Sequence, residues 1–288
     1  MDALVRRMQV PPRLRSMARS LLGAIRVLPR VATTPDYLRR HVLRSWKKES
    51  RLLQSFGLTD GMSVLDLGCG PGHFSECLAN WLPNAHITAL DSNPAMLGRG
   101  RERLGDRVTF VESRADATGL PADAFDFVIA RFLFQHLADP MPVAREALRV
   151  LRPGGKLVIV DVDDELFGVV EPHVPGLKRL LARFGEAQAA RGGNRRVGRS
   201  LLRILRGTGF TEPQIESIAI HSDESGLAEC FPQLDPVPLR ALVAAGKLSE
   251  EEFAEFRAAR EAFVAANDPY ALVLIFAACG VKSADNVQ

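Results

Sequence analysis

The chain has 288 residues, of which 47% are hydrophobic and 25% charged, and its formal net charge is +3 at pH 7. This length is sufficient for one large α/β domain with additional segments, and no apolar run approaches the ~18 residues of a membrane-spanning helix. The four cysteines form no Cys-x-x-Cys pair, which argues against a cysteine zinc site and favours a reduced compartment. We therefore expect a cytoplasmic protein with no membrane span.

The N-terminal part of the chain is basic, because residues 1–51 contain thirteen Lys and Arg and only three acidic residues. Prolines divide residues 1–34 into short helix-capable pieces, whereas residues 37–56 have their less polar positions at helical spacing. We predict a helical arm or cap over residues 1–56. A solvated or oligomer-packing helix is the favoured interpretation, which leaves a homo-oligomer open. Contact with nucleic acid, anionic lipid or an acidic partner, and a role in targeting, stay as alternatives.

Short apolar runs alternate with helical patterns from residue 57 to residue 161, which we predict to be the core domain. The expected strands are residues 63–67, 86–90, 108–111, 125–130 and 156–160, and the expected helices are residues 74–81, 94–104 and 141–151. Strands and helices that alternate at this spacing predict a parallel sheet with right-handed crossovers.

The remaining residues, 162–288, complete the predicted sheet and add two insertions. Patterns typical of helices occur near residues 177–190, 201–205 and 239–266, the last with a capping box at Ser249 and Glu252. Residues 213–220 and the apolar run 270–279 are expected to be the sixth and seventh strands. We place the insertions at about 162–197 and 221–268 and expect them to act as a lid.

The first predicted strand leads directly into the loop Gly68-Cys-Gly-Pro-Gly72, and a helical pattern follows. A strand, a glycine turn and a helix allow a nucleotide-like ligand to lie against bare backbone. The glycines do not have the G-x-G-x-x-G spacing of dinucleotide-binding loops, because position +5 from Gly68 is His73. The carboxylate of Asp66 beside the loop disfavours a pyrophosphate and favours a cationic ligand.

Two further acids follow the ends of the next two predicted strands. Asp91 lies about twenty residues beyond the glycine loop, where a carboxylate can accept the hydroxyl groups of a ribose. Asp116 and Ala117 follow the third strand, where an adenine amino group could donate to the carboxylate. Each acid alone is equally compatible with a strand-end cap, but three acids in step with one glycine loop are much less expected by chance.

These segments resemble a known family. The sequence Val64-Leu-Asp-Leu-Gly-Cys-Gly-Pro-Gly-His-Phe74 resembles motif I of the class I S-adenosylmethionine (SAM) methyltransferases. Later motifs of the family resemble, in the same order, Ala89-Leu-Asp91, Ala115-Asp-Ala117, Phe125-Asp-Phe-Val-Ile-Ala130 and Leu148-Arg-Val-Leu-Arg-Pro-Gly-Gly155. More weakly, Asp161-Val-Asp-Asp164, Gly198-Arg-Ser-Leu-Leu202 and Gly209-Phe210 resemble the ubiquinone-biosynthesis-like subgroup (methyltransferase type 11/25), which methylates small molecules.

The resemblance implies a fold and a set of cofactor contacts. The implied fold is α/β, a Rossmann-like doubly wound sheet of seven strands with the last antiparallel, a helical N-terminal arm and helical lid insertions. The implied cofactor is SAM, with S-adenosylhomocysteine as product. The residues at the matching positions are Asp66, Gly68, Cys69, Gly70, Gly72, Asp91, Ser92, Met96, Asp116, Ala117, Arg131 and Phe132.

The acceptor side is expected at the exit of the fourth strand. There the resemblance directs Gln135 and His136 into the acceptor pocket, and His136 is the first candidate for a base or an orienting donor. Tyr37 is the second candidate, since an N-terminal aromatic ring can close over a sulfonium. Asp163, at the end of the fifth strand, is a candidate ligand for an acceptor hydroxyl or amine. The alternatives are that His136 caps a helix and that Tyr37 only anchors its helix.

Asp161 and Asp164 also lie at the end of the predicted fifth strand. The three carboxylates do not form a clear metal-binding cluster, so we expect no metal. His173 and His221 are expected on the surface of the lid.

The sequence thus predicts a SAM-dependent methyltransferase that acts by in-line displacement on a small-molecule acceptor, most consistent with a secondary metabolite. An NAD(P)-dependent dehydrogenase is disfavoured, because the glycine spacing differs and neither tyrosine begins a Tyr-x-x-x-Lys pair. Nucleic acid is not the favoured partner, although an RNA methyltransferase that uses the basic arm stays an alternative. A SAM-binding protein that no longer transfers methyl groups, either a pericyclase-like catalyst or a regulatory subunit, is another.

Overall fold

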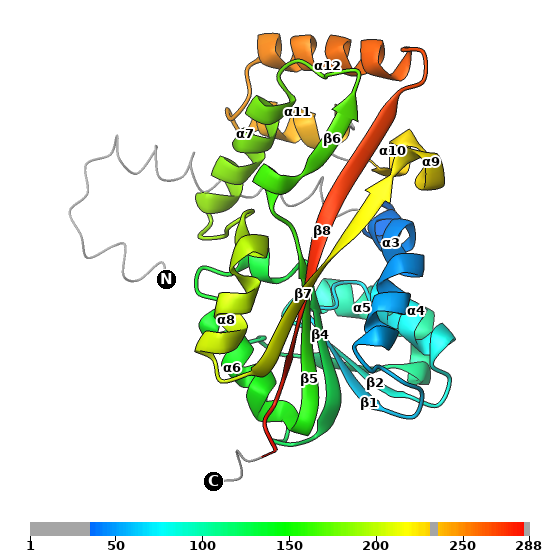
Figure 1. Ribbon diagram of the computed structural model, residues 1–288, viewed down its shortest axis with the longest axis vertical. Coiled ribbons are helices and arrows are strands. Elements are labelled where there is room, and N and C mark those ends of the chain that lie inside the picture. Colours follow the sequence, from blue (N-terminus) through cyan, green and yellow to red (C-terminus); the bar gives the residue numbers. More distant parts are fainter. Residues whose placement is uncertain (1–34, 231–235, 285–288) are drawn as a thin grey trace, which may run out of the picture.

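The computed structural model describes residues 35–230 and 236–284, which form one sheet with helices on both faces (Figure 1). The strands are β1 (Ser63–Leu67), β2 (His86–Asp91), β3 (Thr109–Glu112), β4 (Phe125–Arg131), β5 (Leu151–Asp161), β6 (Gly168–Glu171), β7 (Thr211–His221) and β8 (Tyr270–Val281). The helices are α3 (Pro35–Ser55), α4 (His73–Trp81), α5 (Pro94–Leu104), α6 (Met141–Val150), α7 (Leu177–Ala189), α8 (Leu201–Gly207), α9 (Ser222–Ser225), α10 (Leu227–Cys230), α11 (Pro236–Ala244) and α12 (Glu250–Val264).

The sheet has the order β3-β2-β1-β4-β5-β8-β6, and β7 pairs with β8 as well. Strands β1 to β5 are parallel, with Val64 opposite Ile87 and Leu65 opposite Val128. Strand β8 is antiparallel to β5, β6 and β7. This arrangement confirms the predicted doubly wound α/β fold with an antiparallel last strand. Because the carboxyl ends of β1 to β5 lie at one edge, residues that follow these strands meet there.

Strand β6 is an eighth strand that the sequence analysis did not predict. It lies in the first insertion and pairs with the beginning of β8, from Gly168 opposite Val273 to Glu171 opposite Tyr270. A side chain at position 168 would bring its Cβ to 1.9 Å from the carbonyl oxygen of Leu272, so only glycine permits this pairing. Three of the four residues of this strand are exposed, so its sequence shows no alternating pattern.

The two faces of the sheet have separate apolar cores. On one face, side chains of α3, α4 and α5 pack against the sheet, and on the other α6 and α8 cover it. The strands between them are buried on both faces; Val64, Leu65, Val128 and Ile159 are fully buried. This explains why their sequences are continuous apolar runs rather than alternating ones.

The first insertion and the segment before β8 lie together beyond the carboxyl ends of the parallel strands. Figure 1 shows α7, α11 and α12 around β6 and the first half of β8. The single helix expected at residues 239–266 is two helices, because Gly246 adopts a positive φ of 65° and Ser249 starts a new helix. The predicted capping box of Ser249 and Glu252 is present. Within the described residues, no helix is long and apolar enough to cross a membrane.

Candidate functional site

A cavity of about 410 Å³ lies at the carboxyl edge of the sheet. Its walls come from the loop between β1 and α4, the ends of β2 and β4, helix α3 and helix α7. Most of the lining side chains are apolar, among them Leu38, Val42, Phe74, Met96 and Phe184. The cavity therefore lies where the glycine loop and the predicted acceptor residues meet, between the N-terminal helix and the first insertion.

The glycine loop forms one end of this cavity. Gly68, Gly70 and Gly72 all have positive φ angles, of 79°, 54° and 75°, which other residues adopt only at a cost. The backbone N–H groups of Gly68 and Cys69 donate to the carbonyl of Leu90, so the loop is fixed to the end of β2. A Cβ at position 68 would approach the Leu133 side chain to 3.0 Å. The loop thus exposes backbone, and only glycine keeps that space open.

Two carboxylates border the glycine loop. Asp91 accepts hydrogen bonds from the backbone N–H of Gly70 (2.8 Å) and of Asn93 (2.9 Å). Asp66 is buried and accepts a hydrogen bond of 2.6 Å from the Ser75 hydroxyl. Burial raises the pKa of Asp66 to about 6, against the opposing effect of the Ser75 hydrogen bond. A cationic group in the cavity would restore the ionised form of Asp66.

Helix α3 is held over the cavity by a buried ion pair. The guanidinium of Arg131, at the end of β4, binds Glu49 with a nearest distance of 2.8 Å, and both side chains are buried. It also donates to the carbonyl of His41 (2.7 Å) and to the hydroxyl of Ser45 (3.0 Å). Arg131 lies 4.4 Å from the ring centroid of Phe132, whose φ of 52° is rare for a residue with a side chain. Arg131 thus connects the core strand to the N-terminal helix.

Another part of the cavity wall is formed by the short helix η2 (Phe134–His136) and the first insertion. Gln135 is buried and accepts a hydrogen bond of 3.0 Å from Arg195. His136 lies 2.7 Å, through Nδ1, from the side-chain nitrogen of Gln188 in α7. Desolvation of the ring, and then the charges of Arg195 and Arg191, lower the pKa of His136 to about 4, although the residue as a whole keeps an exposed surface. The imidazole is therefore neutral at pH 7.

Residues 65–159 match a family model described as a methyltransferase domain. The chain is 33% identical over 140 residues to a demethylmenaquinone methyltransferase of Listeria welshimeri, an alignment that covers 47% of this chain and 56% of that protein. The chain spans about half the length of the curated relatives that it matches. The core thus contains a methyltransferase domain that is similar in sequence to menaquinone- and ubiquinone-biosynthesis methyltransferases.

Solved structures of methyltransferases have the same fold. Phosphoethanolamine N-methyltransferase 2 of Haemonchus contortus, solved with phosphomonomethylethanolamine and S-adenosylhomocysteine, has a TM-score of 0.58 at 19% identity, with 89% of this chain and 59% of that chain covered. A methyltransferase structure from Bacillus halodurans has a TM-score of 0.53 at 20% identity, with 81% of this chain and 98% of that chain covered. At these identities the likeness shows the fold alone.

Most residues predicted to hold the cofactor in this methyltransferase domain line the cavity: Asp66, Gly68, Cys69, Gly70, Asp91, Met96, Arg131 and Phe132. Ser92 is exposed and does not line the cavity. At Gly72, a side chain would be directed against the Phe110 ring. Asp116 lies in the loop after β3, where its carboxylate pairs with Arg114 at 2.6 Å, and Ala117 is exposed beside it. For Asp116 and Ala117 an adenine contact stays a prediction.

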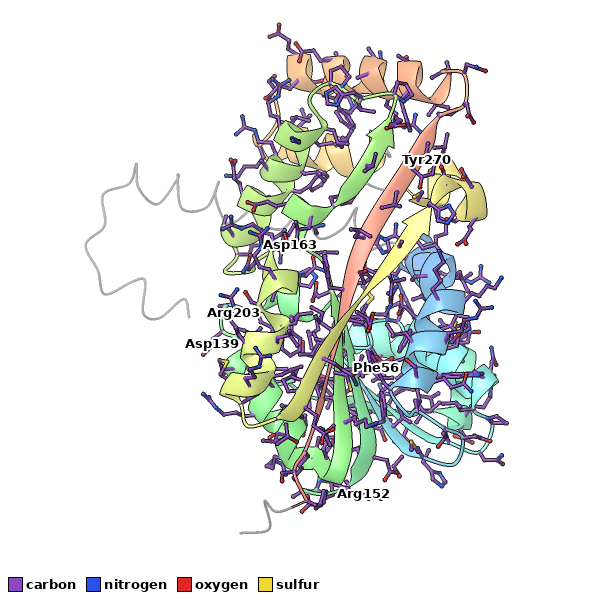
Figure 2. All side chains as sticks on the ribbon, viewed as in Figure 1. Phe56, Asp139, Arg152, Asp163, Arg203 and Tyr270 are labelled. Atoms are coloured by element: carbon purple, nitrogen blue, oxygen red, sulfur yellow. The ribbon has the colours of Figure 1, made fainter. Side chains whose placement is uncertain are left out.

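The predicted acceptor residues are divided between the cavity and its surroundings. Gln135 and His136 line the cavity. Tyr37 belongs to α3, but its side chain lies outside the described residues. Asp163 does not line the cavity: it is buried at the base of the insertion (Figure 2), where Arg199 binds it at 2.5 Å and Glu165 N donates to it. Both of its oxygens have protein partners, and a contact of Asp163 with the acceptor stays a prediction.

Asp161 and Asp164, the acidic neighbours of Asp163, bind residues that line the cavity. Asp161 is buried and accepts hydrogen bonds from the backbone N–H of Gln135 (3.0 Å) and Val162 (2.9 Å), and burial raises its pKa to about 7. Asp164 forms a bidentate ion pair with Arg195. Within residues 35–230 and 236–284, no group of three or more His, Cys, Asp or Glu side chains is arranged to hold a metal ion.

Sequence reasoning missed several residues that form the cavity. His41 lines it from α3 and packs edge-on against the Phe132 ring with centroids 5.6 Å apart. Its position four residues after Tyr37, on the same helix face, was a signal that could have identified it. Phe184 and Arg195, from the insertion, had no such signal, because no family motif and no neighbouring residue tied them to the glycine loop. His173 is exposed, as expected, and His221 is half-buried beside Glu224 at 3.4 Å.

Proposed function

We propose that this chain binds SAM in the cavity and transfers its methyl group to a small, largely apolar acceptor, in the class of secondary metabolites. The observation that carries the proposal is the continuity of one cavity. It runs from a glycine loop with two carboxylates, Asp66 and Asp91, to a neutral imidazole, His136, at the other end. A cationic cofactor and an acceptor that forms a hydrogen bond therefore find suitable groups in the same space.

The residues present fit SAM. Asp91, at the end of β2, would accept the ribose hydroxyls, while the exposed backbone of Gly68 to Gly70 leaves room for the chain of the cofactor. Asp66 would face the ammonium group, whose charge favours the ionised carboxylate. When bound, SAM supplies an electrophilic methyl group on a positively charged sulfur.

The protein's contribution is to position the acceptor and exclude water. Leu38 and Val42 of α3 and Phe184 of α7 line the cavity from outside the core domain, so both added segments shield it from solvent. Arg131 fixes α3 in this position through Glu49. Restricting an apolar acceptor between these side chains brings its reacting atom into line for displacement, which is the main requirement for methyl transfer. The similar proteins include methyltransferases that are named for the small molecules demethylmenaquinone and geranyl diphosphate.

The test is the formation of S-adenosylhomocysteine. The full chain is incubated with SAM and a panel of aromatic and isoprenoid acceptors that carry hydroxyl or carbonyl groups, and the product is quantified by mass spectrometry. Turnover with at least one acceptor, abolished in Asp91→Ala and retained in Asp106→Ala, supports the proposal; Asp106 is exposed and lies outside the cavity. Tight SAM binding with no product from any acceptor would favour the non-methylating alternative.

The RNA methyltransferase alternative has one observation in its favour. A groove of about 560 Å³ along α3 has five basic side chains in its lining, Arg40, Arg44, Lys47, Lys48 and Arg51, together with Glu224, which pairs with Lys48 at 2.6 Å. Residues 1–34 contain further basic residues and lie outside the part of the chain that the structure describes. Binding of tRNA that weakens steeply with salt, and that is lost in a variant without residues 1–34, would support this alternative.

A further inference from the structure

Helix α7 contacts η2 through one buried polar side chain, that of Gln188. The side chain is buried, and its nitrogen Nε2 lies 2.7 Å from Nδ1 of His136 and 3.2 Å from the carbonyl oxygen of Gln135. Its oxygen Oε1 accepts a hydrogen bond of 3.2 Å from Arg191. Gln188 and Arg191 thus join Gln135 and His136, so a part of the insertion and the η2 helix form one hydrogen-bond network.

The orientation of the Gln188 amide follows from this network. A carbonyl oxygen can only accept and a guanidinium can only donate, so the amide nitrogen must face Gln135 and the amide oxygen must face Arg191. The second hydrogen of the amide nitrogen is then directed to the imidazole of His136. Nδ1 of His136 is therefore the hydrogen-bond acceptor in this pair.

The close packing of the insertion against η2 supports a fixed contact between Gln188 and His136. A Cβ at position 193 would lie 2.4 Å from the carbonyl oxygen of Gln135 and 2.5 Å from Nε2 of Gln188. Gly193 therefore allows the chain to approach η2 as closely as it does, and Asn194 N donates to the same carbonyl at 2.8 Å. These contacts hold Gln188 against His136 and leave little room for other arrangements.

We propose that Gln188 is a positioning residue that keeps His136 in the tautomer with its proton on Nε2. The inference rests on the proposed function and deepens it. A neutral imidazole that accepts at Nδ1 must carry its proton on Nε2, where it can only donate. His136 then acts as a hydrogen-bond donor and not as a base.

The proposal defines one property of the acceptor. It must present a hydrogen-bond-accepting atom, a carbonyl or an already ionised oxygen, to Nε2–H of His136, and His136 takes no proton from it. Two other imidazoles line the cavity: that of His73, at the start of α4, and that of His41 in α3, whose Nδ1 is 3.0 Å from a guanidinium nitrogen of Arg44. The helix η2 and the insertion would thus favour acceptors that have a hydrogen-bond-accepting oxygen, and would not require an acidic proton on the acceptor.

The test reads the tautomer directly. The full chain is labelled with ¹⁵N-histidine, and two-bond ¹⁵N–¹H correlations at neutral pH report which ring nitrogen of each of the six histidines carries the proton. His136 is assigned by its absence in His136→Asn. The proposal predicts a single neutral form with the proton on Nε2, in the absence of cofactor and acceptor. A proton on Nδ1, or a mixture of both tautomers, would overturn it.

Two variants of Gln188 complete the test. Gln188→Glu replaces the donor by an acceptor of the same shape, so the His136 proton should move to Nδ1, whereas Gln188→Leu should give both tautomers. Lys178→Gln, an exposed change in the same helix, should leave the spectrum as in the wild type. Circular dichroism and SAM affinity verify folding and the cofactor site. If Gln188→Glu folds and retains the Nε2 tautomer, the role of Gln188 is refuted.

The kinetic readout separates this proposal from the proposed function. With an acceptor that is turned over, Gln188→Glu should lower kcat by about tenfold, the loss expected for one hydrogen bond, with less than a twofold change in SAM affinity. An equal kcat in both proteins would refute the positioning role. The tautomer measurement requires no turnover, so failure to find an acceptor affects the proposed function and leaves this inference testable.

Discussion

The two ends of the cavity are built in different ways. At the cofactor end, the glycine loop, Asp66, Asp91 and Met96 lie within about thirty residues of sequence and follow two adjacent strands. At the acceptor end, Leu38, His136, Phe184 and Arg195 come from α3, η2 and the first insertion, and are far apart in the sequence. Local sequence therefore specifies the first end, whereas the second exists only after α3 and the insertion have packed on the core.

The largest expected effect concerns the contact that joins α3 to the core. Glu49→Ala leaves the buried guanidinium of Arg131 without its carboxylate partner, which typically costs about 3–5 kcal/mol. We expect a loss of this size in the free energy of unfolding measured by urea denaturation. Glu102→Ala, an exposed change in α5, is the matched control and should change stability by less than about 0.5 kcal/mol. An equal stability for the two variants would show that α3 is not fixed by this ion pair.

The cofactor end should respond to pH. The pKa of Asp66 is raised to about 6, so this carboxylate gains a proton as the pH falls through 6. SAM binding favours the ionised form, so affinity is full above pH 6 and should fall about tenfold for each unit below it. Titration calorimetry from pH 5 to pH 8 measures this. Ser75→Ala removes a hydrogen bond that lowers the pKa, and should move the loss of affinity to higher pH. The same profile in both proteins would contradict the assignment to Asp66.

A rise in pH changes the contribution of Asp66 to folding stability in the opposite direction from its contribution to SAM affinity. In the unfolded chain Asp66 has an ordinary pKa near 3.8, so between pH 4 and pH 6 the folded protein binds more protons than the unfolded chain. Its contribution to stability is therefore present at low pH and is lost as the pH rises through about 6. The cofactor and the proton thus compete for this buried carboxylate, which distinguishes this end of the cavity from the acceptor end.

The smallest expected effect concerns the acceptor end. Phe184→Ala removes an apolar wall from α7, and should raise KM for an apolar acceptor by about tenfold, which corresponds to about 1.4 kcal/mol of lost apolar contact. The SAM affinity should stay within twofold of the wild type, because Phe184 lies at the other end. Leu166→Ala, exposed in the same insertion, serves as the control. A parallel loss of SAM affinity in Phe184→Ala would show that the two ends are not separable.

The difference between the two ends also explains what the sequence could predict. Strand runs, glycine spacing and acids at strand ends are local patterns, and they predicted the parallel strands β1 to β5 and the glycine loop between β1 and α4. The same reasoning placed Asp163 in the acceptor site, because it ends β5, but its charge is paired with Arg199, thirty-six residues away. That partner, and the Gln188 contact with His136, arise from packing of the insertion, which has no motif of its own.

The central claim is that this cavity binds SAM through the acids at its cofactor end. Isothermal titration of the full chain with SAM, compared with Asp91→Ala and with the control Asp106→Ala, tests it most directly. We predict saturable one-to-one binding in the wild type and the control, and at least about tenfold weaker binding in Asp91→Ala, since the carboxylate that would accept the ribose hydroxyls is lost. Equal affinities in all three proteins, or no binding in the wild type, would contradict the account.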